Sequence, residues 1–227
     1  MSIIAFLYGT VLASFITLCA DRIPKHVSIL YPRSRCDNCQ VQLRYWQLIP
    51  IFGYLFQLGH CKNCHHHISP ISTCVELIIG LIALHAPLNH PLQLICFILF
   101  YGFLLFISLT DLSHQFFYST GLLGLLPGIF IFESAKRWEW QLGCVMITTL
   151  LFLLLLAHLT NGLGSGDIEL ILIFEILLDF EQTMWIICIS SLLALFTILL
   201  TRHQSRIPFV PFLSLGFLIV TQIFYYM

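Results

Sequence analysis

The stretch LQLICFILFYGFLLFISLTD, residues 92 to 111, decides the fold class. Apart from its last residue, Asp111, it contains no charged side chain. A helix that crosses about 30 Å of hydrocarbon needs about 20 apolar residues. Residues 92–110 therefore predict a transmembrane helix that ends at a carboxylate on the membrane boundary.

The whole chain has the composition of a membrane protein. Its 227 residues are 59% hydrophobic and 9% charged, whereas soluble domains have about 45 to 50% apolar and about 25% charged residues. A soluble fold of this size cannot bury so much apolar surface. The expected surroundings are therefore membrane lipid. The net charge of −1 gives no support to a nucleic-acid partner.

Seven further segments have a similar apolar composition, which predicts an all-α integral membrane protein with a bundle of about eight transmembrane helices. They run at about Ile3 to Ala20, Ile71 to Ala86, Phe117 to Phe132, Gln141 to Thr160, Ile168 to Leu178, Met184 to Thr201 and Pro208 to Tyr226. The first lacks the basic start and cleavage site of a removable signal peptide, so we expect it to remain as a span. The segment at 117–132 is interrupted by Gly and Pro, and the one at 168–178 is short and acidic, so both suit a bundle interior.

The basic residues predict the orientation of these spans. Eight of the ten fall on one side of an eight-span chain, namely Arg22, Lys25, Arg33, Arg35, Arg44, Lys62, Arg202 and Arg206. By the positive-inside rule, residues 21–70 are cytoplasmic and both termini lie outside. Asp111 and Asp167 then share the cytoplasmic boundary. The expected domains are a first helix at 1–20, a Cys-rich loop domain at 21–70 and a bundle at 71–227.

Two CxxC units lie in the predicted cytoplasmic loop. Cys36 and Cys39 form the first, and Cys61 and Cys64 form the second. Two such turns provide the four thiolates of a tetrahedral zinc-ribbon-like site, which would stabilise a loop domain with little core of its own. The alternative is two disulfides or free thiols, and a reducing cytoplasm argues against disulfides. We therefore expect a structural zinc ion.

The two boundary aspartates form the candidate catalytic pair. Asp167 alone could be a helix N-cap, but Asp111 ends a helix, where an acid opposes the dipole. Two carboxylates close together in a poorly solvated site cannot easily both ionise, so the pair would share a proton, one acting as base and the other as acid. Gly164 and Gly166 would let a substrate backbone approach closely. The pattern favours an aspartic peptidase.

With these residues the chain resembles the type 4 prepilin peptidases, membrane aspartic peptidases that trim pilin-like precursors. The resemblance covers nearly the whole sequence, in the segments Asp21–Pro24, Ser34–Cys36, Ile49–Ile51, Ile68–Pro70, Val75–Leu77, Thr110–Gln115, Gly164–Asp167 and Ile207–Phe212. It implies that Asp111 and Asp167 are the catalytic dyad. It also implies a precursor with a short basic leader and an apolar helix, cut on the cytoplasmic side. Family members often methylate the new N-terminus with S-adenosylmethionine, for which no dedicated signature is visible.

Two segments depart from the family pattern. Phe116–Tyr118 stands where Ile-Pro-Asp is usual, and Glu169 stands where a Lys is usual. The added negative charge of Glu169 beside Asp167 predicts a shifted pH dependence of cleavage or an altered leader preference.

Glu76 is a further candidate site-shaping residue. It lies a few residues into the second span, where an acid is costly unless it is paired or faces a cavity. Substrate contact and a structural pair with Arg or His are both open, and the resemblance favours the first. Glu175 is deeper in its span, and we expect it to make an internal hydrogen bond.

Three other functions are consistent with parts of the sequence. A multi-spanning transporter or channel with a cytosolic zinc-binding module would explain Glu76 and Glu175, and predicts solute flux. A membrane-tethered zinc module that only recruits partners would tolerate Asp111→Asn. A presenilin-like peptidase would cut within the apolar helix instead of before it.

Overall fold

The computed structural model describes residues 2–88, 90–115, 119–132, 140–160, 163–201 and 208–225. Its helices divide between two compact units, Met1–Pro91 and Leu92–Met227. Several residues used above lie outside the described ranges, namely the Phe116–Tyr118 departure, the basic residues Lys136, Arg137, Arg202 and Arg206, and Ile207 of the last matching segment.

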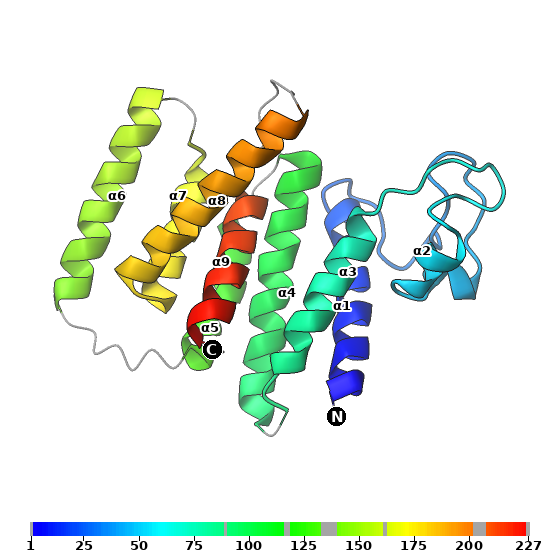
Figure 1. Cartoon of the computed structure of the whole chain (residues 1–227), viewed down its shortest axis with the longest axis horizontal. Coiled ribbons are helices and arrows are strands. Elements are labelled where there is room, and N and C mark those ends of the chain that lie inside the picture. The colour runs from blue at the N-terminus through cyan, green and yellow to red at the C-terminus, as the bar shows by residue number, and fades with distance from the viewer. Residues whose placement is uncertain are drawn as a thin grey trace. The chain divides into compact units, whose positions relative to one another are not determined.

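The first unit is built on two long helices that pack side by side. These are α1 (Ser2–Arg22) and α3 (Ile71–Ile82), which continues into the short helix η2 (Ala83–His85) (Figure 1). A Cβ atom added to Gly9 would lie only 2.6 Å from the Cβ of Ala83. Small residues let membrane helices approach closely, so the Gly9–Ala83 contact sets the packing of this pair.

Residues 23–70 connect these two helices. This segment contains the 3-10 helix η1 (Tyr45–Leu48) and the short helix α2 (Phe52–Phe56). Its described residues form no extended strand, only two isolated antiparallel bridges, Arg35 with Gln42 and His60 with His67. Each bridge closes one of the two CxxC turns.

The second unit is a helical bundle. Its elements are α4 (Pro91–His114), η3 (Ser119–Leu125), α5 (Gly128–Ile131), α6 (Trp140–Thr160), α7 (Ser165–Leu177), α8 (Phe180–Thr201) and α9 (Val210–Tyr225). The aromatic rings of Phe100, Phe132, Phe174 and Phe217 pack together in its core, with the Phe174 and Phe217 centroids 4.5 Å apart. Helix α7 lies among α6, α8 and α9, so its residues are mostly buried.

Three described helices are long and apolar enough to cross a membrane. They are Ile3–Arg22, Pro91–His114 and Phe180–Leu200. Shorter apolar helices cover Ile71–His85, Ser119–Ile131, Gly143–Leu159 and Val210–Ile223. The prediction of a mostly helical, multi-pass membrane protein is confirmed, while the number of eight spans stays a prediction. The segment at 119–131 is a 3-10 helix followed by one α-turn, because Gly and Pro interrupt it.

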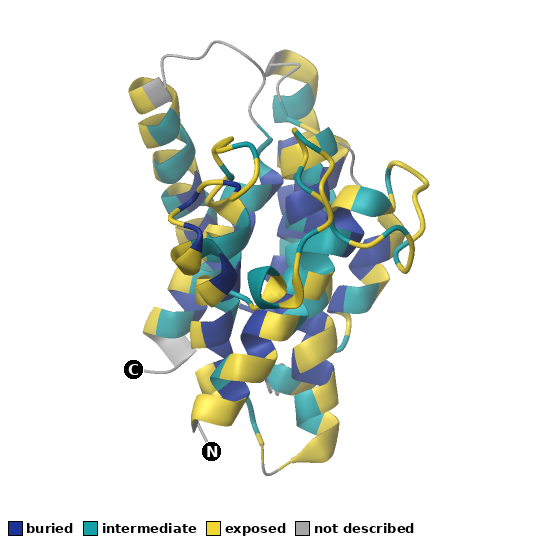
Figure 2. Cartoon of the chain, turned by 90° about the vertical axis from the view of Figure 1, so that its right-hand side faces the viewer, coloured by how far each residue is buried: buried dark blue, intermediate teal, exposed yellow. Residues whose placement is uncertain are grey.

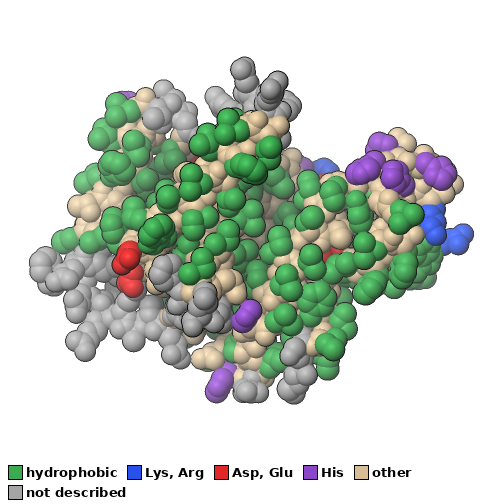
Figure 3. Space-filling view, viewed as in Figure 1, with side chains coloured by type: hydrophobic (Ala, Val, Ile, Leu, Met, Phe, Trp, Pro, Cys, Tyr) green, Lys and Arg blue, Asp and Glu red, His purple; other side chains and the backbone are tan. Residues whose placement is uncertain are grey.

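The outer faces of the helices are apolar. Leu151, Phe196 and Leu199 are each more than half exposed, and hydrophobic side chains cover the visible faces of α6 and α8 (Figure 3). Within the helices, buried and exposed residues alternate from face to face (Figure 2). Exposed apolar surface of this extent is expected where lipid is the solvent.

Candidate active site and cysteine cluster

Asp111 lies in the last turn of α4 and faces the beginning of another helix. Its carboxylate lies near the backbone N–H of Val210, the first residue of α9, and this N–H favours the charged carboxylate. The first N–H groups of a helix have no partner within it and carry partial positive charge. The unfavourable position of Asp111 at the end of its own helix is therefore offset by the positive end of α9.

One oxygen of Asp111 has no partner among the described residues. The Oδ2 atom is buried and makes no hydrogen bond to any of the described residues. An ionised carboxylate oxygen that is removed from solvent needs a donor. A water molecule or a substrate group would supply one, which is the property required of a catalytic carboxylate.

Asp167 lies in the first turn of α7. Its side chain is 8% exposed, and its Oδ2 accepts a hydrogen bond from the backbone N–H of Gly164 at 3.1 Å. This contact closes the start of the helix, so the capping role considered for Asp167 is present in the structure. A Cβ on Gly164 would lie 3.1 Å from the same oxygen, and any larger residue there would press on the carboxylate.

The structure brings the two aspartates together. Asp111 is close enough to Asp167 for its charge to act on the Asp167 carboxyl. Both residues belong to the second compact unit, although 55 residues separate them along the chain. Gly166 is buried beside Asp167, and Glu169 is half-buried in the same turn. The arrangement has the two acidic groups that hydrolysis by general acid and base requires.

The sequence did not indicate that the Val210 N–H would lie near Asp111. The only related signal was the segment Pro208-Phe209-Val210-Pro211, because Pro is frequent in the first turn of helices and has no N–H to leave unpaired. That pattern predicts where a helix begins, but it does not predict which side chain the helix end will face.

Glu76 lies on α3 in the first unit. Its side chain is 6% exposed, and Oε2 accepts a hydrogen bond from the backbone N–H of Ile51 at 2.8 Å. It forms no ion pair within the described ranges, where Lys25 with Asp21 is the single ion pair. The structural pair with Arg or His that the sequence left open is therefore not present among these residues.

Glu175 is fully buried on α7. The hydroxyl of Thr149 on α6 lies 3.1 Å from its Oε1. Thr149 Oγ1 also lies 3.0 Å from the carbonyl oxygen of Val145, one turn earlier in α6. The expected internal hydrogen bond is thus present, and it joins α6 to the helix that carries Asp167.

The four cysteines of the CxxC units form one cluster. Their Sγ atoms all lie within 4.8 Å of one another, with Cys36 and Cys64 at 3.8 Å and Cys39 and Cys61 at 3.9 Å. Tetrahedral zinc with Zn–S bonds of about 2.3 Å places its sulfur ligands roughly 3.8 Å apart. None of the four is in a disulfide. The donor set and its spacing fit a zinc ion.

The two cysteine turns have matching backbones. The N–H of Gln40 donates to Cys36 O at 2.9 Å, and the N–H of His65 donates to Cys61 O at 2.9 Å. Gln40 and His65 both have a φ of 56°. In the second turn, the backbone N–H groups of Cys64 and Asn63 lower the pKa of the Cys61 thiol to about 6. That thiol is thereby favoured as a thiolate, the form that binds metal.

Histidine side chains surround this second turn. His60, His65, His66 and His67 are exposed, and the histidines gather on the surface of the loop region (Figure 3). No histidine joins the four sulfur atoms in the metal-ligating cluster of the described residues.

Comparisons with known proteins cover both units. Residues 7–89 match the Bacterial Peptidase A24 N-terminal domain, and residues 98–199 match the Type IV leader peptidase family. The chain is 31% identical to the prepilin leader peptidase/N-methyltransferase of Bacillus subtilis (strain 168), over 94% of this chain and 90% of that protein. No solved structure matches.

Relatives from other bacteria also match most of the chain. The prepilin leader peptidase/N-methyltransferase of Stutzerimonas stutzeri is 26% identical, over 89% of this chain and 75% of that protein. The type 4 prepilin-like proteins leader peptide-processing enzyme of Escherichia coli O78:H11 is 24% identical, over 95% of this chain and 91% of that protein. The order of the two matched domains and the coverage of both chains agree with the sequence resemblance. The chain belongs to the Type IV leader peptidase family.

Proposed function

We propose that this enzyme removes the leader peptide of pilin-like precursors and that Asp111 and Asp167 are its catalytic pair. The family membership supports the reaction. The observation that supports the pair is the closeness of the two carboxyls at the end of α4 and the start of α7, with Asp111 Oδ2 lacking a donor among the described residues. The comparisons do not favour a transporter or channel.

In the proposed reaction, one carboxylate takes a proton from a water molecule, and the oxygen of that water attacks the scissile carbonyl carbon. The protonated carboxyl of the other aspartate donates its proton to the carbonyl oxygen. The tetrahedral intermediate then collapses, the C–N bond breaks, and the leaving amine takes a proton from the pair. The step consumes one water molecule and one amide bond, and it produces one carboxyl group and one amine.

The membrane topology of the proposal follows the positive-inside rule. Eight spans place residues 21–70 in the cytoplasm, both termini outside, and the aspartate pair at the cytoplasmic face of a bacterial inner membrane. Residues 71–227 would then carry the peptidase bundle. A precursor would place its apolar helix among the spans and its short basic leader near the basic loop.

Zinc would have a structural role in this proposal. Cys36, Cys39, Cys61 and Cys64 would hold it, and their closed set of four thiolates leaves no position for a substrate. The ion would fix the fold of residues 21–70.

A second activity, methylation of the new N-terminus, has one specific support. Relatives that match most of the chain are named prepilin leader peptidase/N-methyltransferase. S-adenosylmethionine would be the methyl donor. The peptidase and the methyltransferase reactions would follow one another on the same substrate.

Co-expression with a pilin-like precursor tests the proposal. Wild type should shorten the precursor at the junction between its leader and its apolar helix, and Asp111→Asn and Asp167→Asn should leave it uncut. Intact mass of the product reports the cleavage position and any added methyl group. A product cut within the apolar helix would instead indicate intramembrane proteolysis, and processing by both variants would remove the pair from the mechanism.

A further inference from the structure

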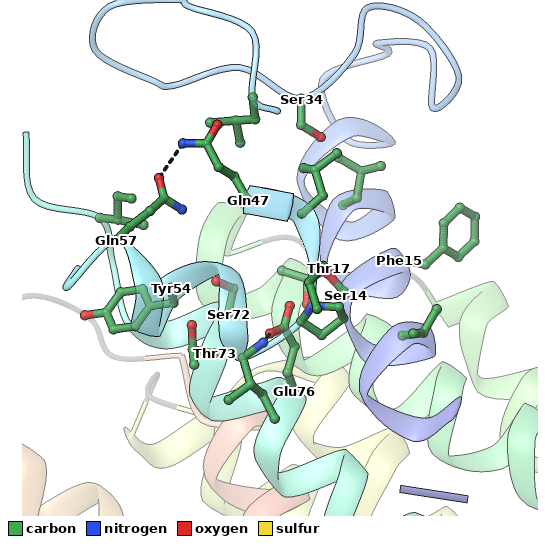
Figure 4. A pocket seen from close by; sticks show the side chains of 18 of the residues that line it. Ser14, Phe15, Thr17, Ser34, Gln47, Tyr54, Gln57, Ser72, Thr73 and Glu76 are labelled. Carbon is green, nitrogen blue, oxygen red and sulfur yellow. Dashed lines mark hydrogen bonds between the residues drawn. The ribbon is translucent and has the colours of Figure 1, made fainter. Parts of the chain in front are cut away.

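The first unit contains a cavity of 770 Å³. One side is formed by α1, another by η1, α2 and the loop that joins them, and a third by the start of α3. Figure 4 shows Glu76 extending from α3 toward the side where Ser14 and Thr17 of α1 lie. These walls also carry aliphatic side chains such as Val11, Leu18 and Ile49.

The charged residues that line this cavity are both acidic. They are Asp21 and Glu76, and no Lys, Arg or His contributes to the lining. Asp21 is exposed and pairs with Lys25. Glu76 is buried, and its contact with Ile51 uses only Oε2. A buried carboxylate without a cation is costly, so this cavity is suited to a positively charged ligand.

The backbone that contacts Glu76 is strained. Ile51 has φ 62° and ψ −56°, and the N–H of Phe52 donates to Pro50 O at 2.6 Å. These values describe a γ-turn with a positive φ at a β-branched residue, a conformation that is rare and unfavourable. Strain of this kind persists only where the surrounding structure enforces it, and it is concentrated at ligand sites. Here it directs the Ile51 N–H to the Glu76 carboxylate.

The wall that carries this turn is held by a local network. The side-chain amide of Gln47 donates to Gln57 Oε1 at 2.8 Å (Figure 4), and Gln57 donates to Gly53 O at 2.7 Å. A Cβ at Gly53 would collide with the carbonyl oxygen of Gln47. The wall is therefore formed before any ligand binds, which reduces the entropy lost on binding.

We propose that this cavity binds an organic cation carried on an apolar stem, with Glu76 as its counter-charge. The aliphatic walls would contact the stem, and the hydroxyls of Ser14, Thr17, Ser72 and Thr73 lie among the lining residues as polar contacts. Two sources share this chemistry. One is a lysine or arginine side chain of the precursor's leader, and the other is the sulfonium of a methyl donor. Both sources rest on the proposed function.

Matched pairs of probes that differ in charge test the site. The full-length protein, purified in lipid nanodiscs with its metal bound, is titrated with S-adenosylmethionine against S-adenosylhomocysteine. It is also titrated with a lysine-containing leader peptide against the same peptide with norleucine. At least one charged probe should bind tenfold or more tightly than its neutral partner. Glu76→Gln should remove that preference, because the amide keeps the acceptor for the Ile51 N–H but carries no charge.

A second variant guards against loss of folding. Thr17→Leu places a bulkier side chain of α1 in the cavity and leaves Glu76 in place. It should therefore weaken binding of the favoured probe as well. Equal binding of charged and neutral probes by wild type would overturn the proposal, as would a preference that survives in Glu76→Gln. The probe pair that responds identifies the source.

The cation site and the peptidase pair can fail independently. Asp111→Asn and Asp167→Asn lie in the other compact unit and should bind the favoured probe as wild type does. Probe binding without cleavage in wild type would count against the proposed function alone. Cleavage without charge-selective binding would count against this cavity alone.

Discussion

The backbone N–H of Val210 lies close enough to the carboxylate of Asp111 to favour its negative charge. This proximity links the end of α4 to the beginning of α9, and Asp111 Oδ2 is buried without a donor among the residues that the structure describes. This buried oxygen needs a donor, which a water molecule or a substrate group can supply. A carboxylate that these residues do not fully satisfy suits a catalytic acid or base.

Replacing Val210 by Pro should reduce cleavage about 10- to 100-fold, because it removes the N–H that favours the Asp111 charge, and a donor to a charged group contributes roughly 1.5–3 kcal/mol. Pro is tolerated in the first turn of a helix, so α9 should still form. The measurement is the initial rate of precursor cleavage by purified enzyme. Val210→Ala keeps the N–H and is the control; a loss of the same size in Val210→Ala would show that packing, and not the donor, matters.

Gly164→Ala should lower the cleavage rate several-fold with little effect on folding. The backbone at Gly164 is extended, with φ −75° and ψ 151°, so alanine meets no backbone strain there. Its Cβ would press on the Asp167 carboxylate from 3.1 Å, and Gly164→Val should be worse. Gly143→Ala is a matched control because a Cβ there contacts nothing within 4 Å. Equal rates for Gly164→Val and wild type would contradict the prediction.

Cys61→Ser should release the metal and destabilise residues 21–70. Removal of one thiolate from a four-thiolate zinc site leaves an incomplete tetrahedron, and the metal stabilises a segment with little core. Zinc content by elemental analysis and the melting temperature of the purified protein report the effect. Cys74→Ser, at an exposed cysteine outside the cluster, should retain full zinc. A strong chelator should reproduce Cys61→Ser in wild type, and a metal-free wild type with an unchanged melting curve would refute a structural role.

Gly9→Ala should destabilise the α1–α3 pair by about 1–3 kcal/mol, the usual cost of overpacking. The new methyl group would lie 2.6 Å from the Ala83 Cβ, so the helices must separate. Adding Ala83→Gly removes the opposing atom and should restore part of the loss. Thermal unfolding of the single and double variants measures this coupling. Strictly additive effects would show that the two residues do not share this contact.

Glu169→Lys should shift the pH profile of cleavage toward lower pH. A negative charge beside two carboxyls makes loss of their proton harder, and a positive charge makes it easier. Glu169 is half-buried one turn from the start of α7, so its charge is partly shielded from solvent. Rates are compared across pH for wild type, Glu169→Lys and Glu169→Gln, which should fall between them. Superimposable profiles would remove any role of Glu169 in tuning the pair.

Much of the fold could be predicted because lipid requires long apolar helices. Residues 92–110 contain no charge, and α4 covers them; α1 and α8 follow from the same pattern. The segment at 119–131 was less predictable, since composition alone does not separate a broken 3-10 helix from a span. The thiolate cluster could be predicted from the CxxC spacing, because each unit is a local turn.

The contacts made across the fold could not be predicted. The Val210 N–H has no sequence signature, and its role depends on how α9 meets α4. The γ-turn at Ile51 was equally hidden, because isoleucine is a poor residue for a positive φ. Glu76 could be identified as unusual from its place in a span, whereas its cavity depends on residues far away in sequence.

The most direct test of the catalytic pair is a double-mutant comparison of turnover. The rates of leader removal by Asp111→Asn, Asp167→Asn and the double variant are measured with one purified precursor. If the two carboxyls act as a unit, each single variant should lose at least about 1,000-fold, and the double variant should be no slower than the worse single one. Losses that multiply in the double variant, or a single variant that retains substantial turnover, would contradict the account.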